Sequence, residues 1–136
     1  MKCPFLFVYG TLRRNTRNKM ASLLAKHAEF IGYASYQGKL YNIGNYPGLV
    51  PSDKLTDRVQ GELYRLRNPG LLLARLDKYE ECGPDFPQPI EYVRKIQRVR
   101  LQGGKAIPAW VYLYNWPTDT FELMPSGNLL ILEKGH

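Results

Sequence analysis

The stretch IEYVRKIQRVRLQGGKAIPAWVYLY, residues 90–114, decides the fold class of this 136-residue chain. Two runs of strand-forming residues, 90–101 and 106–114, flank Gly103 and Gly104, which together allow a tight reversal of the backbone. The stretch therefore predicts a β-hairpin. Both faces of its second strand should be covered, because small and aliphatic side chains alternate with aromatic ones: Ala109, Val111 and Leu113 on one face, Trp110, Tyr112 and Tyr114 on the other.

The rest of the chain adds more strands than helices. Apolar or alternating runs predict strands at 5–8, 30–33, 37–43 and 59–66, and apolar side chains at three- and four-residue spacing predict helices within 16–30 and 68–82. Two proline-rich segments, 44–51 and 83–89, are predicted as loops. We expect a single domain over residues 1–136, of class α+β: a compact, mixed and strongly curved sheet or small barrel with a few packed helices.

Composition and charge restrict the classes of function. The net charge of +7 arises from basic residues that form no nucleic-acid recognition motif, so a solvated face that steers small acidic ligands is favoured over nucleic-acid binding. No apolar run is long enough to span a membrane or to act as a secretion signal, and we expect a cytoplasmic protein. Cys3, Cys82, His27 and His136 have no metal-ligand spacing, so no metal site is predicted.

The segment FLFVYGTLRRN, residues 5–15, carries an apolar run into a turn that could bind an anion. Directly after Tyr9, Gly10 permits backbone angles and a close ligand approach that a side chain would prevent. The N–H groups of Gly10, Thr11 and Leu12 could form a small nest for a carboxylate or phosphate. A strand followed by Gly-Thr is also common without a ligand, and both interpretations stay open.

A second candidate is Glu80 in NPGLLLARLDKYEEC, residues 68–82. At about 100° per residue, Glu80 falls within the apolar stripe of the predicted helix, whereas Glu81 points to the opposite side with Asp77 and Ala74. A charged carboxylate on a core-facing stripe is costly unless it lies at a cleft, meets a partner or takes up a proton. The alternative is that the helix ends near Glu80 and the side chain reaches water.

Six segments taken in order, FVYGTLRRN, YPGLV, QGELY, LDKYEE, EYVRKIQRV and WVYLYN, resemble the gamma-glutamylcyclotransferase-like proteins. The resemblance covers residues 5–115 and is strongest to small bacterial members and to gamma-glutamylamine cyclotransferase. It implies a barrel-like sheet with a cavity between the turn and a glutamate carried by the helix. Residue by residue, it implies that Glu80 is the catalytic acid/base and that the substrate is cradled by Tyr9, Gly10, Thr11 and Leu12.

The resemblance also implies an activity that needs no cofactor. A small gamma-glutamyl amine or peptide would cyclise to 5-oxoproline and release its amine, because the α-amine can attack the γ-carbonyl of the same residue. Glu81 and Cys82 depart from the glycine that many relatives have after the glutamate, and a second carboxylate could alter the proton affinity of Glu80. Four hairpin residues could line the cavity, although aromatic strand residues are more often core: Tyr92, Arg94, Tyr112 and Tyr114.

Two other classes of function stay open beside the enzyme. The altered sequence after Glu80 is compatible with a non-catalytic module that binds a small carboxylated metabolite in the same cavity. The basic residues leave nucleic-acid binding as the less favoured alternative. No oligomeric state is predicted.

Overall fold

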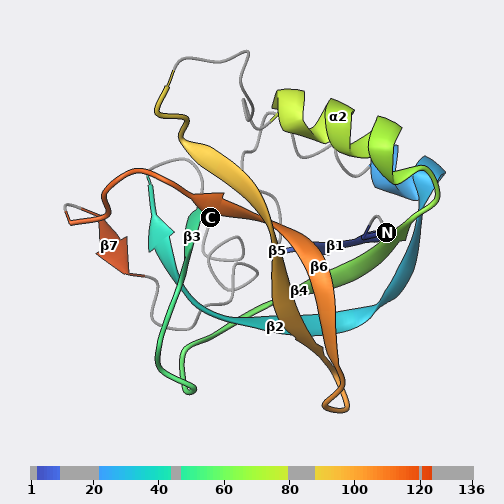
Figure 1. Cartoon of the computed structure of the whole chain (residues 1–136). Coiled ribbons are helices and arrows are strands. Elements are labelled where there is room, and N and C mark those ends of the chain that lie inside the picture. Colours follow the sequence, from blue (N-terminus) through green and yellow to red (C-terminus); the bar gives the residue numbers. More distant parts are fainter. Residues whose placement is uncertain (1–2, 10–21, 44–46, 80–87, 120, 124–136) are drawn as a thin grey trace.

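The computed structural model describes residues 3–9, 22–43, 47–79, 88–119 and 121–123 (Figure 1). The predicted site residues Gly10, Thr11, Leu12 and Glu80 lie outside the described residues. Glu81, Cys82 and most of the second proline-rich segment lie outside them as well. Among the described residues, no helix is long and apolar enough to cross a membrane.

Five strands of the described chain close into a small barrel (Figure 1). Around the barrel, β2 (Ala28–Asn42) pairs with β4 (Arg58–Leu66), followed by β1 (Phe5–Val8), β6 (Ala106–Tyr114) and β5 (Tyr92–Leu101), and β5 pairs again with β2. β1 and β6 are parallel and the other pairs antiparallel, so the sheet is mixed. The helix α2 (Pro69–Tyr79) lies across one side of the barrel. The predicted α+β class and small barrel are confirmed.

Strand β2 replaces two predicted strands and the end of a predicted helix. The helical residues 22–27 end at His27, which is exposed, and the strand then runs for 15 residues with a register shift between Phe30 and Gly32. The prediction that the helix includes Ala28 was wrong, because Ala28 and Glu29 pair with the end of β4, while Phe30 lies in a strand as predicted. From Ala34 to Leu40 alternate residues are buried, which is the period of a strand with one face on the core.

The first proline-rich segment was predicted as a loop, and this was wrong in its second half. β3 (Pro47–Pro51) is a strand that pairs with the far end of β2, with Leu49 opposite Leu40. The two prolines lie at the ends of an edge strand, where a missing N–H breaks few ladder bonds. Pro47, Gly48 and Leu49 are buried, so this segment is part of the core rather than a surface turn.

The predicted hairpin is confirmed, and its turn sets a specific register. Gly103 and Gly104 have φ values of 105° and 104°, a region that favours glycine. Leu101 N–H donates to the carbonyl of Lys105, so the connection spans three residues, and Arg100 pairs with Ala106. The same register places Arg94 directly opposite Tyr112. A two-residue connection at the glycines would place Arg94 opposite Leu113, with its side chain on the other face.

The core fills the barrel and the space between barrel and helix. As predicted, both faces of β6 are covered, since Ala109 and Val111 are fully buried and Tyr112 and Tyr114 nearly so. At Gly61 the strands approach so closely that a Cβ atom would collide with the carbonyl of Val8 and the ring of Phe7. Further buried residues come from every barrel strand and the residue after β1, from α2 and from the helical residues 22–27: Leu6, Tyr9, Leu24, Ala28, Ala34, Tyr36, Leu40, Val59, Leu63, Leu66, Leu72, Leu73, Leu76, Tyr92, Val99 and Leu113.

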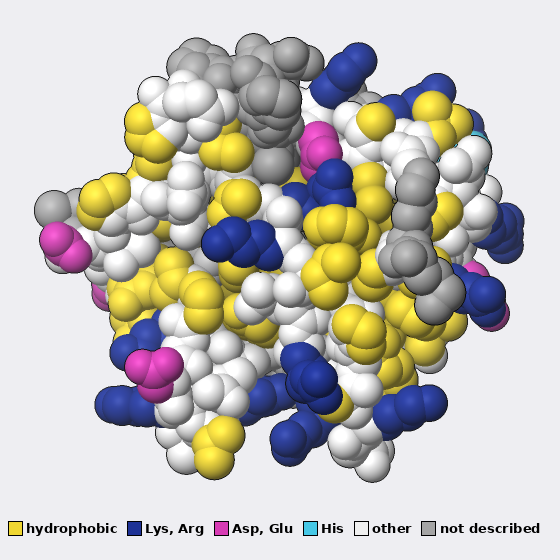
Figure 2. Space-filling model, viewed as in Figure 1, with side chains coloured by type: hydrophobic (Ala, Val, Ile, Leu, Met, Phe, Trp, Pro, Cys, Tyr) yellow, Lys and Arg dark blue, Asp and Glu magenta, His cyan; other side chains and the backbone are white. Residues whose placement is uncertain are grey.

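Several basic side chains lie at the end of the barrel far from α2. Figure 2 shows Lys and Arg along the lower rim of this face, over the hairpin end of β5 and β6, and further Lys and Arg among hydrophobic side chains higher up. Arg98, Arg100 and Lys105, at this end of the hairpin, are exposed. Burial, and next the nearby charge of Arg100, lower the pKa of Arg58, which lies on β4. Part of the described positive charge is therefore distant from α2.

Candidate active site

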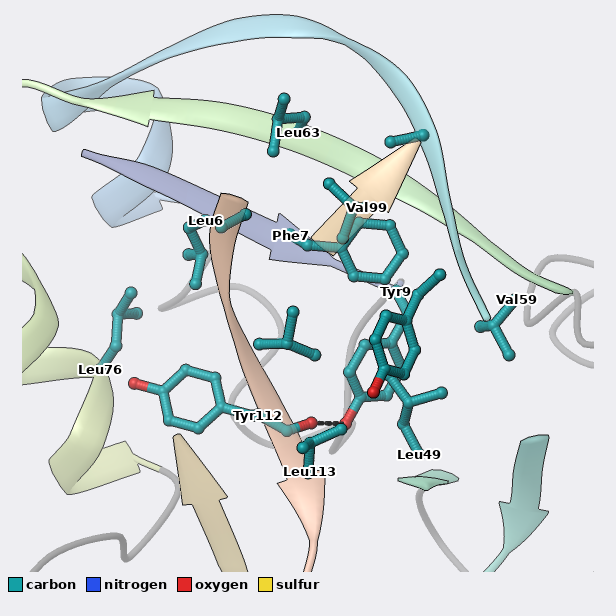
Figure 3. Packing of buried hydrophobic residues seen from close by; sticks show 14 of the residues in the cluster. Leu6, Phe7, Tyr9, Leu49, Val59, Leu63, Leu76, Val99, Tyr112 and Leu113 are labelled. Atoms are coloured by element: carbon teal, nitrogen blue, oxygen red, sulfur yellow. Dashed lines mark hydrogen bonds between the residues drawn. The ribbon is translucent and has the colours of Figure 1, made fainter. Parts of the chain in front are cut away.

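Tyr9 is the predicted turn residue that the structure describes. It directly follows β1, is only 2% exposed, and its hydroxyl donates to the main-chain carbonyl of Tyr112 at 2.7 Å (Figure 3). Its ring lies 6.3 Å from that of Phe7, the residue that anchors β1 in the core. The end of β1 is thus tied to β6, and the chain enters the Gly10–Leu12 segment from a fixed point.

The helix α2 begins and packs as its sequence predicts. Pro69 occupies the first helical position, where its missing N–H is not needed, and the N–H of Leu72 donates to the carbonyl of Asn68. Leu72, Leu73 and Leu76 are buried and form the apolar stripe. Glu80 follows the last helical residue that the structure describes.

Asp77 was predicted to point away from the core, and this was wrong. Its side chain is only 20% exposed, and its Oδ1 accepts a hydrogen bond of 2.6 Å from the Tyr112 hydroxyl. Arg94 donates to the same carboxylate twice, from Nε to Oδ1 at 2.7 Å and from Nη2 to Oδ2 at 2.9 Å. Asp77 lies one turn after the buried Leu73, so it stands at the edge of the stripe where the helix meets β5 and β6.

Arg94 is held on two sides. Its guanidinium lies 4.2 Å from the centroid of the Trp110 ring, and its planar fork matches the Asp77 carboxylate. Trp110 is itself anchored, because its indole N–H donates to the carbonyl of Cys3. Arg94 therefore joins α2 to the barrel, a role that the sequence did not predict.

The four hairpin residues expected to line a cavity fall into two groups. Arg94 and Tyr112 meet at Asp77 under α2. Tyr92 and Tyr114 pack on each other with centroids 5.5 Å apart, and the Tyr92 hydroxyl donates to the carbonyl of Pro47. Burial, and next the charge of Glu91, raise the pKa of Tyr114. Tyr92 and Tyr114 thus join the hairpin to β3, while Arg94 and Tyr112 join it to the helix.

Tyr112 connects the two segments that lead to the predicted site. Its carbonyl accepts from Tyr9, and its ring extends from β6 toward α2 beside Leu76, where its hydroxyl reaches Asp77 (Figure 3). Sequence reasoning missed Asp77 because helical angles alone placed it on the outer side. The pairing of Arg94 with Tyr112 on one face was the signal that could have found it, but it depends on the hairpin register. Among the described residues, no group of three or more His, Cys, Asp or Glu side chains could hold a metal ion.

Comparison with known proteins assigns the whole arrangement to one group. The family model described as "Gamma-glutamyl cyclotransferase, AIG2-like" matches residues 6–130. The "Gamma-glutamylcyclotransferase family protein YtfP" of Escherichia coli K12 is 35% identical over 130 residues, 95% of this chain and 98% of the relative. Its solution structure has a TM-score of 0.62, with 33% identity over 95% of this chain and 98% of that chain. The "Gamma-L-glutamyl-butirosin B gamma-glutamyl cyclotransferase" of Niallia circulans is 37% identical over 118 residues, 82% of this chain and 67% of the relative.

Proposed function

Since this chain belongs to the AIG2-like gamma-glutamyl cyclotransferase family, we propose that it cyclises a gamma-glutamyl amine or peptide to 5-oxoproline and releases the amine. Glu80 is the general acid/base, and the main-chain N–H groups of Gly10, Thr11 and Leu12 hold the α-carboxylate of the glutamyl unit. Tyr9 supports that turn from β1. One observation carries the proposal: Tyr112 accepts a hydrogen bond from Tyr9 through its carbonyl and donates one to Asp77 through its hydroxyl.

The reaction balances without a cofactor. The α-ammonium of the substrate loses a proton to Glu80, and the free amine attacks the γ-carbonyl to form the new C–N bond of a five-membered lactam. Glu80 then gives this proton to the departing nitrogen, and the old γ-amide C–N bond breaks. The lactam nitrogen releases its second surplus proton, which the freed amine takes up, so the products are 5-oxoproline with a neutral amide nitrogen and an ammonium ion. One carboxylate in a partly apolar setting suits both steps, because burial brings its pKa toward the working range.

Asp77 is near this site in the sequence but is a poor candidate for the base. Its carboxylate already accepts two hydrogen bonds from Arg94 and one from Tyr112, so its acceptor capacity is largely used. Glu80 comes three residues later in the sequence. Tyr9 stands next to Gly10. Contacts of described residues on both sides therefore support a common site for Glu80 and the turn.

The test is a direct assay of 5-oxoproline. The protein is incubated with a panel of gamma-glutamyl dipeptides, gamma-glutamyl alkylamines and gamma-L-glutamyl-butirosin B, and the product is measured by mass spectrometry. The last compound belongs in the panel because the Niallia circulans relative is named for it. We expect turnover of at least one compound. A folded protein that forms no 5-oxoproline from any of them would contradict the proposal.

Two neighbouring carboxylates provide a matched pair of variants. Glu80→Gln should reduce kcat by about 100-fold or more, because it removes the only group assigned to proton transfer. Glu81→Gln makes the same chemical change one residue away and should keep most of the activity. If the protein is instead a binding module, the wild type shows no turnover, and Glu80→Gln leaves its affinity for a gamma-glutamyl compound nearly unchanged.

A further inference from the structure

Two hydrogen bonds of Tyr112 join segments that are far apart in the sequence. Its carbonyl oxygen accepts the Tyr9 hydroxyl at 2.7 Å, and its own hydroxyl donates to Asp77 at 2.6 Å. Arg94, paired with Tyr112 across the hairpin, binds the same Asp77 carboxylate with two N–H groups. A single residue of β6 is therefore bonded both to the end of β1 and to the last described turn of α2.

The hydrogen bonds to Asp77 are directional, whereas the surrounding apolar contacts are not. Leu72, Leu73 and Leu76 hold α2 on the barrel by burial, which is strong but has little directional preference. Apolar packing alone specifies the rotation and height of a helix less sharply than directional bonds do. The hydrogen bonds to Asp77 have defined lengths and angles, and the Arg94 fork adds a planar constraint. They select one rotation and one height of the helix.

We propose that Tyr112 is a positioning residue that fixes the end of α2 relative to the turn after β1, with Asp77 and Arg94 holding the helix against it. The inference rests on the proposed function, in which Glu80 follows that end of the helix and Gly10 follows Tyr9. In this role Tyr112 acts through the helix and the turn that it joins. It sets the spacing between the proton-transferring side and the carboxylate-binding side of the site.

The decisive variant is Tyr112→Phe, which removes one hydroxyl and keeps the ring, the main-chain carbonyl and the Asp77–Arg94 pair. We expect kcat to fall by about 10- to 100-fold with KM changed less than about 3-fold, because a misplacement near 1 Å costs about that much. Tyr36→Phe is the matched control. Tyr36 is a buried barrel tyrosine whose hydroxyl donates to Gln97 at 2.7 Å, against 2.6 Å for Tyr112 to Asp77, so the same atom and a bond of similar length are lost at another place.

Both variants should lose similar thermal stability, but only Tyr112→Phe should lose kcat. The proposal is overturned if the kcat of Tyr112→Phe matches that of Tyr36→Phe. A cycle with Asp77→Asn tests whether the two residues act as one unit: the double variant should be no more than about 3-fold slower than the slower single variant. If the double variant lost kcat by the product of the two single losses, Tyr112 and Asp77 would act independently, which would contradict the proposal.

Tyr9→Phe tests the other bond of Tyr112. It releases the end of β1 while the Asp77 link stays intact, so the expected effect is mainly on substrate binding: KM should rise by about 5- to 20-fold while kcat changes less than the effect of Tyr112→Phe. The two phenylalanine variants should thus differ in which kinetic constant they change. If both variants changed kcat and KM in the same way, the two hydrogen bonds of Tyr112 would not have the separate roles proposed for them.

A measurement without substrate distinguishes failure of this inference from failure of the proposed function. In ¹H–¹⁵N spectra, Tyr112→Phe should shift the amide signals of the segment around residue 80, whereas Tyr36→Phe should leave them in place. If the wild type shows no turnover but these shifts occur, the enzyme assignment fails and the positioning role stands. If turnover is normal in the wild type and Tyr112→Phe shifts no signal beyond its strand neighbours, the positioning role fails alone.

Discussion

Two arginines on the same face of β5, Arg94 and Arg100, lie in opposite electrostatic settings. They are six residues apart, or about 20 Å along a strand. Arg94 is largely covered, paired with Asp77 and stacked on Trp110. Arg100 is exposed, and its charge helps to lower the pKa of Arg58, whose guanidinium donates to Ser35. At one end of the strand Arg94 pairs with an acid, and at the other end Arg100 lies near a second positive charge, that of Arg58.

The two ends of β5 show two uses of positive charge: an ion pair that sets an orientation, and exposed charge that attracts acidic molecules from a distance. A matched and half-buried pair such as Arg94–Asp77 contributes little net stability over an apolar pair of the same shape, but it fixes an orientation. Within the described part of the chain, neither Arg58 nor Arg100 forms an ion pair with an acid. Exposed positive charge such as the Lys and Arg along the lower rim in Figure 2 can raise the encounter rate with acidic substrates. The end under α2 is therefore the one suited to precise placement of groups.

The largest expected loss of stability comes from breaking the Arg94–Asp77 pair. Asp77→Ala leaves the Arg94 guanidinium and the Tyr112 hydroxyl without this acceptor, and the free energy of unfolding should fall by about 2–4 kcal/mol, somewhat below the range for fully buried pairs. Urea denaturation measures it. Asp57→Ala is the control at the other end of the molecule, where Asp57 accepts from Ser52 and lies 4.0 Å from Lys39. Its loss should be about 1 kcal/mol. Equal losses would remove the contrast between the ends.

The second prediction replaces the whole pair. Asp77→Leu combined with Arg94→Met removes both charges and keeps similar volume, so the double variant should recover at least half of the stability lost in Asp77→Leu alone. Under the proposed function its kcat should nevertheless stay about 10-fold or more below that of the wild type. Stability from urea denaturation and kcat from the 5-oxoproline assay give both values. Recovery of both together would mean that the pair serves stability only.

A smaller effect comes from exchanging one cation for another at each end. Arg94→Lys keeps the charge but loses the planar fork and part of the stacking on Trp110, at a cost of about 1 kcal/mol. Arg58→Lys loses bonds to the hydroxyl and carbonyl of Ser35 and should cost about 0.5 kcal/mol, because this site is wetter. Thermal unfolding of the two variants side by side provides the comparison. A larger loss at Arg58 would reverse it.

The smallest expected effect is a gain in stability, and it comes from removing the charge of Arg100. The pKa of Arg58 is lowered in the folded state, so its charged form is disfavoured there and removal of a repelling neighbour should stabilise the fold. Arg100→Gln should raise the free energy of unfolding by about 0.3 kcal/mol at low salt, and the gain should shrink above about 0.5 M salt because of screening. Urea denaturation at two salt concentrations measures this. A gain that grows with salt would contradict the explanation.

The local features of the fold follow from the sequence. The glycine pair and its flanking strands predicted the hairpin, and the spacing of Leu72, Leu73 and Leu76 predicted the buried side of α2. These predictions succeed because backbone angles and side-chain periodicity depend on nearby residues. The family resemblance predicted the barrel, and the strand pairing confirms it. The roles of Glu80 and of Gly10, Thr11 and Leu12 stay predictions.

Other features were decided by partners that lie far away in the sequence. Residues 28–30 could continue a helix, but pairing with the end of β4 makes them a strand, and Pro47–Pro51 became β3 because the long β2 extends past the barrel to receive it. Asp77 was placed on the wrong side because helical angles do not show what packs beside a stripe.

The sequence by itself determined which residues bend, alternate and bury, since each of these properties follows from local stereochemistry and side-chain chemistry. Only the tertiary structure decided that Arg94 lies opposite Tyr112 and that both meet Asp77. The physical reason is that a strand register shifted by one residue turns every side chain to the other face. That register is selected by the energy of the whole packed barrel together with its turn.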